Sequence, residues 1–94
     1  MSAADEAEVQ RLTERLRADP DDLRIALALA DLLDRLGRDL DLLSLLSARM
    51  EEGDDEVREV MAPRRRVVLL RLEASARAAG RASEAELYEL MAAM

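Results

Sequence analysis

Two segments of the chain share the same order of helix-breaking residues. Pro20 lies seventeen residues before the pair Gly37-Arg38, and Pro63 lies seventeen residues before Gly80-Arg81. An apolar stretch with helical spacing lies between each proline and its glycine, and another follows each Gly-Arg pair. This offset of forty-three residues, with proline at the start and glycine at the turn, indicates repeated helical hairpins, the building unit of helical solenoids.

The composition favours helices throughout. Half of the 94 residues are hydrophobic, and these are almost all Leu, Ala, Val and Met. Tyr88 is the only aromatic residue, whereas β-strands are enriched in aromatic and β-branched side chains. We therefore predict one all-α domain over residues 1–94, with a core of leucine and methionine side chains.

The apolar spacing predicts about five helices, three of them in the first half of the chain. The first covers residues 4–18, with Ser2 or Asp5 as its N-cap, and it carries one narrow apolar stripe. The second follows the Asp-rich break around Pro20 and ends at Leu36. Because it is apolar on more than one face, we expect it to be buried on two sides. The third runs from Asp39 or Asp41 to about residue 51.

The second half of the chain predicts two further helices. One begins at Asp55, is kinked or broken at Pro63, and ends before Gly80. The last covers residues 83–93, with Ser83 and Glu86 as a capping box. These boundaries divide the domain into a preceding helix at 4–18, a first hairpin at 20–52, an acidic insertion at 53–62 and a second hairpin at 63–94.

The charge is acidic and unevenly distributed. The net charge is −7, and residues 51–62 carry six acids and one arginine, whereas residues 63–94 carry six arginines and four acids. An acidic chain repels phosphate backbones, so we expect no nucleic-acid partner.

Several classes of function lack the residues that they need. The chain has no cysteine, no histidine and no lysine, so it lacks thiolates, imidazoles and Schiff-base amines. The longest uninterrupted apolar run, 25–30, is far shorter than the roughly 20 residues of a membrane span. No basic region followed by an apolar one marks a signal peptide. We expect a cytoplasmic protein that is not an enzyme, binds no cofactor or metal, and does not enter a membrane.

The order helix, Gly-Arg turn, helix, preceded by Asp-Pro-Asp-Asp, resembles the tetratricopeptide repeat family. In that family a proline closes one repeat, a glycine caps helix A, and a small residue on helix A lets helix B approach. Those features fall here at Pro20, Gly37 and Ala30, and again at Pro63 and Gly80. The resemblance implies a right-handed stack of antiparallel helical hairpins, an α-solenoid. The offset is longer than the usual 34 residues, and a two-helix repeat of the HEAT or armadillo kind fits it better but the Gly-Arg pairs less well.

The resemblance also implies a function and a binding face. Helix A of each hairpin would line a concave groove that takes an extended or helical peptide, which makes the chain a protein–protein interaction or scaffold module. The groove-facing positions would be Arg24, Leu27, Asp31 and Asp34 in the first hairpin and Val67, Leu70, Ala74 and Arg77 in the second.

Two other clusters are candidates for contact with a partner. Arg64, Arg65 and Arg66 could bind an anion or an acidic peptide, or they could be a solvated helical turn. Leu87, Leu90, Met91 and Met94 form an apolar face that could be part of the core. Alternatively, this face could join two copies as a homodimer, or pack on neighbouring repeats of a longer array.

Overall fold

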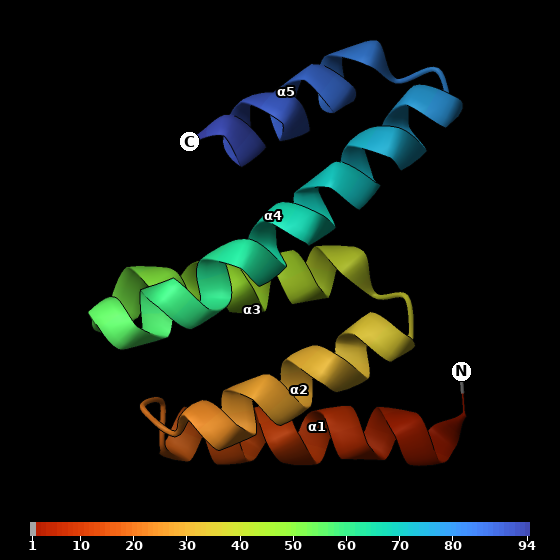
Figure 1. Cartoon of the computed structure of the whole chain (residues 1–94). Helices are drawn as coiled ribbons and strands as arrows, with labels where there is room; N and C mark the ends of the chain where they lie inside the picture. Colours follow the sequence, from red (N-terminus) through yellow and green to blue (C-terminus); the bar gives the residue numbers. More distant parts are fainter. Residues whose placement is uncertain (1) are drawn as a thin grey trace.

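The computed structural model of the chain describes residues 2–94, and within them it contains five α-helices and no strand. The helices are α1 (Ala3–Ala18), α2 (Leu23–Arg35), α3 (Asp39–Glu52), α4 (Asp55–Ala78) and α5 (Ala82–Ala93), shown in Figure 1. The predicted all-α class is confirmed.

Each helix packs mainly against its immediate neighbours along the chain (Figure 1). The resulting molecule is flat, with extents of 38 × 35 × 14 Å. Its core is a continuous layer of aliphatic side chains between α1, α2, α3 and α4. Leu46 and Met61 in this layer are completely shielded from solvent, and so is Leu69 on α4. As expected, α2 is buried on two sides, because it contacts both α1 and α3.

Side-chain caps hold the starts of three helices. Ser2, Asp22 and Asp54 each accept a backbone N–H from the first turn of the helix that follows, α1, α2 and α4 respectively. Of the two residues predicted as the first N-cap, Ser2 and Asp5, Ser2 is the cap. Pro20 lies in the turn before α2, where its missing N–H leaves no helical hydrogen bond unmade.

The predicted capping box of Ser83 and Glu86 is wrong. Helix α5 begins at Ala82, and Arg81 occupies the N-cap position without a side-chain cap. The chain enters α5 directly from the glycine turn, so Ser83 already lies in the first helical turn, where its hydroxyl is no longer at the cap.

The two Gly-Arg turns have the same geometry. Gly37 and Gly80 have φ of +71° and +77°, the left-handed region that glycine adopts readily. Each glycine donates its N–H to the carbonyl three residues earlier at 3.1 Å. Arg38 and Arg81 donate theirs to the carbonyl five residues earlier, at 3.0 and 2.8 Å. This is the Schellman arrangement, and its occurrence at both positions gives the sequence repeat a structural counterpart.

The acidic segment 53–62 is not a separate element. Helix α4 begins at Asp55, as predicted, and continues through Pro63 without a break. Pro63 cannot donate a backbone hydrogen bond, so the carbonyl of Glu59 lacks its usual helical partner. The turns before Pro63 are held by packing instead, since Met61 is fully buried and Val57 packs against the core.

None of the helices in the described part of the chain is long and apolar enough to cross a membrane.

Candidate functional site

The face predicted to bind a peptide brings α2 and α4 together. Arg64 on α4 pairs with Asp31 on α2 at 2.8 Å, and Arg71 pairs with Asp34 at 2.6 Å. A small cavity of about 140 Å³ lies between these helices and includes Val67 in its lining. Asp34 and Val67 both line this cavity, and Asp31 binds Arg64, which also lines it.

The acids of this face already have partners within the chain. The Arg71 guanidinium binds Asp34 and also Asp39 at the start of α3, at 3.0 Å, so one side chain joins three helices. Such half-exposed ion pairs are each worth about 0–1 kcal/mol and can be exchanged for contacts with a ligand. They leave little open volume in the absence of such exchange.

The other residues predicted for the groove divide into two groups. Arg24, Leu70 and Ala74 are exposed, as a ligand-contacting position should be. Leu27 is partly buried against the core, and Arg77 pairs with Glu73 and with Glu89 of α5. Arg77 is thus directed toward α5 rather than toward α2.

The three consecutive arginines of α4 leave the helix in different directions. Arg64 binds Asp31 on α2, and the Nε of Arg65 donates to Ser47 Oγ on α3 at 3.0 Å. Arg66 is exposed and makes no hydrogen bond or ion pair within residues 2–94. Consecutive residues project about 100° apart around a helix, so the three guanidinium groups do not converge on one point.

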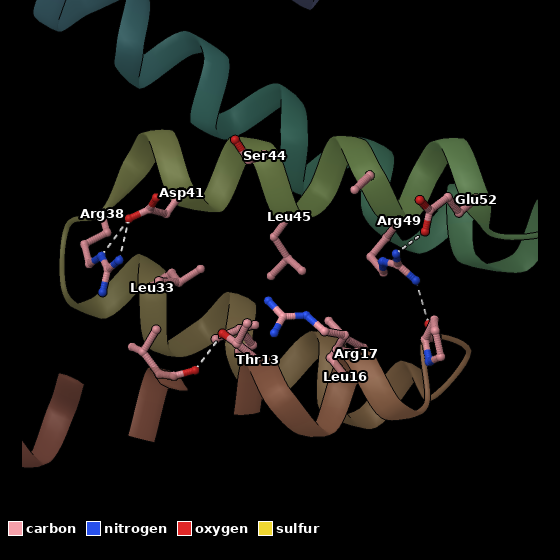
Figure 2. A pocket seen from close by; sticks show the side chains of 14 residues that line it. Thr13, Leu16, Arg17, Leu33, Arg38, Asp41, Ser44, Leu45, Arg49 and Glu52 are labelled. Carbon is pink, nitrogen blue, oxygen red and sulfur yellow. Dashed lines mark hydrogen bonds and ion pairs between the residues drawn. The ribbon is translucent and has the colours of Figure 1, made fainter. Parts of the chain in front are cut away.

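A larger groove, not anticipated from the sequence, lies between α1 and α3. Its volume is about 600 Å³, and α2 forms its floor (Figure 2). The apolar part of the lining comes from three helices: Val9 and Leu16 of α1, Leu29 and Leu33 of α2, and Leu45 of α3.

Hydrogen bonds fix both ends of this groove. At one end Arg38 pairs with Asp41 at 2.7 Å and with Glu6 of α1 at 3.3 Å. The hydrogen bond to Asp41 is the main reason that the pKa of Arg38 is raised above its ordinary value. At the other end Arg49 donates to the carbonyl of Pro20 at 2.7 Å and also binds the carboxylate of Glu52.

Arg17 is the cation of this groove that lacks a partner. Its side chain extends into the space between α1 and α3 (Figure 2) and is exposed. It makes no hydrogen bond or ion pair with any residue from 2 to 94, unlike Arg38 and Arg49. The groove therefore combines an apolar floor with one free positive charge, which suits an apolar ligand that carries an acid.

The sequence contains only weak signals for this groove. The narrow apolar stripe predicted for the first helix includes Val9 and Leu16, and both are buried. The separation between α1 and α3 determines whether a space remains above that stripe. No local pattern encodes this separation, because α1 and α3 are not consecutive.

The apolar face predicted on α5 is largely bare. Leu87, Leu90 and Met94 are 55%, 66% and 98% exposed, although Met91 is partly buried and faces a cavity beside α4. Helix α5 packs on α4 through the opposite side, where Ala85 is fully buried.

No group of three or more acidic, histidine or cysteine side chains suited to holding a metal ion occurs in the part of the chain that the structure describes. Comparison with protein-family models, with curated proteins and with solved structures finds no match to this chain.

Proposed function

We propose that this chain is a non-catalytic protein–protein interaction module that binds a peptide or a segment of a partner protein in the groove between α1 and α3. The groove itself carries the proposal. Its volume of about 600 Å³ lies within the roughly 300–1,000 Å³ range of ligand sites, and its apolar floor lies beside a free guanidinium.

The architecture in this proposal is a right-handed stack of antiparallel hairpins similar to tetratricopeptide repeats. Three observations support it. The two Gly-Arg turns share one hydrogen-bond pattern. The α2–α4 ion pairs join residues 31 with 64 and 34 with 71, in the same order along both helices. In addition, α3 is tied near the start of α1 by Arg38 and near its end by Arg49.

The geometry of the groove favours a helical ligand. Two helices form its walls and a third forms its floor, an arrangement that accepts the apolar side of an amphipathic helix. The Arg38–Glu6 ion pair at one end and the Arg49–Pro20 hydrogen bond at the other hold the walls in place before a ligand arrives, which reduces the ordering cost of binding. The α2–α4 face offers a second, smaller surface with Val67 and Leu70 exposed. In this proposal the module works in the cytoplasm, the location expected from the sequence.

The test is a selection of peptides from a displayed random library, followed by fluorescence anisotropy with the peptides obtained. Ser44 lies on the groove and is exposed, so Ser44→Arg should block the groove without disturbing the core. Ala28→Arg places the same side chain at an exposed position of α2 that does not line the groove. We expect Ser44→Arg to weaken binding at least about tenfold and Ala28→Arg to leave it unchanged. Equal binding by both variants would rule out the groove.

The bare face of α5 favours a second candidate, a self-associating structural domain. Exposed apolar side chains on one side of a helix are typical of an interface. In this alternative, Leu87, Leu90, Met91 and Met94 of two copies would meet in a symmetric homodimer. Sedimentation would then show a dimer as the largest species, even at high protein concentration.

A further inference from the structure

We infer that the α1–α3 groove of one copy receives helix α5 of a second copy, so that the chain associates head to tail. This inference deepens the proposed function, since it uses the same groove and names its occupant. It differs from the symmetric homodimer because the two surfaces in contact are different.

The apolar stripe of α5 is short enough to fit within the groove. Leu87 and Leu90 lie on the side of α5 opposite the buried Ala85, and Met94 follows directly after the helix. The groove lining extends from Val9 to Arg17 on α1 and from Asp41 to Glu52 on α3. At about 1.5 Å per residue, the lining covers about 12 Å of α1 and about 16 Å of α3, whereas Leu87 to Met94 span about 10 Å.

The free charges of the two surfaces are complementary. Of the three acids on α5, Glu84 pairs with Arg81 and Glu89 pairs with Arg77. Glu86 flanks the stripe, is exposed, and has no ion-pair partner over positions 2–94. The groove presents the free guanidinium of Arg17 beside its apolar floor. Docking of α5 therefore places one unpaired acid near one unpaired base while three apolar side chains leave water.

The positions of the two surfaces determine the kind of assembly. The groove lies among α1, α2 and α3, whereas α5 lies at the other end of the row of helices (Figure 1). A copy that has docked its α5 still has a free groove, and its neighbour still has a free α5. Such a heterologous contact produces rings or open chains rather than closed dimers.

A pair of charge reversals tests this arrangement on the full chain. In Arg17→Glu the groove and α5 are both acidic, and in Glu86→Arg both are basic, so each variant alone should repel itself. An equimolar mixture restores an opposite pair at every contact, in alternating order. Sedimentation velocity over a concentration series measures the size of the assemblies. We expect the wild-type chain to form species larger than a dimer as its concentration rises. Each single variant should associate at least about tenfold more weakly, and the mixture should regain the wild-type behaviour.

A matched control separates local pairing from the change in net charge. Arg15→Glu makes the same charge change on an exposed residue of α1 outside the groove, so it should associate as wild type does. Circular dichroism checks that all variants keep their helices. The inference is overturned by a wild-type chain that stays monomeric, by association that stops at two copies and ignores Arg17→Glu, or by a mixture that fails to recover. A monomeric wild type that still selects peptides through the groove would overturn only this inference and leave the proposed function standing.

Discussion

At the scale of single residues, the two left-handed glycines show how little sequence is needed to fix a turn. A Cβ added at Gly37 or Gly80 would meet no heavy atom within 4 Å, so space does not require glycine at either position. The requirement comes from the backbone, which has φ of +71° and +77° there. Each glycine allows one helix to end and the next to begin within four residues.

Replacing either glycine should therefore cost only backbone energy. We expect Gly37→Ala and Gly80→Ala each to lower the free energy of unfolding by about 1–2 kcal/mol, because an L-residue disfavours the left-handed region. Asn enters this region more readily, so Gly37→Asn and Gly80→Asn should lose less. Urea unfolding of the four variants measures the difference. Equal losses for Ala and Asn would point to a cause other than backbone conformation.

Met61 and Leu90 are apolar residues of similar size on predicted helices, but they differ in burial. Met61 is completely buried between α3 and α4, whereas Leu90 is 66% exposed on α5. We expect Met61→Ala to cost about 2–5 kcal/mol, since it leaves a cavity. Leu90→Ala should change the stability of the monomer by no more than about 0.5 kcal/mol. Thermal unfolding at low protein concentration checks both values, and a large loss for Leu90→Ala would mean that the α5 face is covered.

At the scale of elements, α4 is the helix whose local sequence conflicts most with its structure. It has 24 residues, and Pro63 lies inside it. A proline inside a helix costs about 3 kcal/mol through its missing N–H and its clash with the preceding turn. The helix nevertheless continues, because Met61 is fully buried and Val57 packs against the core, and these contacts keep the first turns in place.

Removal of the proline should stabilise the protein. We expect Pro63→Ala to raise the free energy of unfolding, by up to about 3 kcal/mol, since Ala restores the N–H that the carbonyl of Glu59 lacks. Ala74→Pro, at an exposed position of the same helix, should lower it by a similar amount. Guanidinium unfolding gives both numbers. A loss of stability in Pro63→Ala would show that the packing of α4 on α3 depends on Pro63.

The helices and their turns were predictable because their signals are local. Asp55 was recognised as the start of α4, and Gly37 and Gly80 as helix ends, from the types of a few neighbouring residues. The N-cap of α5 was predicted wrongly at Ser83, whose hydroxyl is suited to capping, because the helix begins at Ala82, one residue before it. The groove between α1 and α3 was not predictable, since it depends on the distance between helices that are not consecutive. Arg17 lines a groove only because α1 and α3 lie that distance apart, which the residues around Arg17 do not determine.

At the scale of the whole molecule, the helices form a row in which each one packs against its neighbours in sequence (Figure 1). In the flat outline of 38 × 35 × 14 Å, the core is one extended layer between the helices. In such a row, the free energy of unfolding is approximately the sum of the intrinsic stability of each helix and the stabilisation from its contacts with its neighbours. The helices at the ends have fewer neighbours than those in the middle.

Amide hydrogen exchange should follow this order. We expect the strongest protection where α3 and α4 meet, around Leu46, Met61 and Leu69, which are fully buried. Protection should decrease toward α1, which is held mainly by α2. Exchange followed by mass spectrometry at low protein concentration resolves the individual helices. Uniform protection over all five would show that the chain opens only as one unit.

The packing of each helix on its sequence neighbour also has a kinetic consequence. Native contacts join residues that are close along the chain, so little loop entropy is lost before the contacts form. Topologies of this kind typically fold in microseconds to milliseconds. The protein should therefore refold on the microsecond-to-millisecond timescale that temperature-jump and stopped-flow experiments measure. A newly made chain can also acquire native structure helix by helix as it is synthesised.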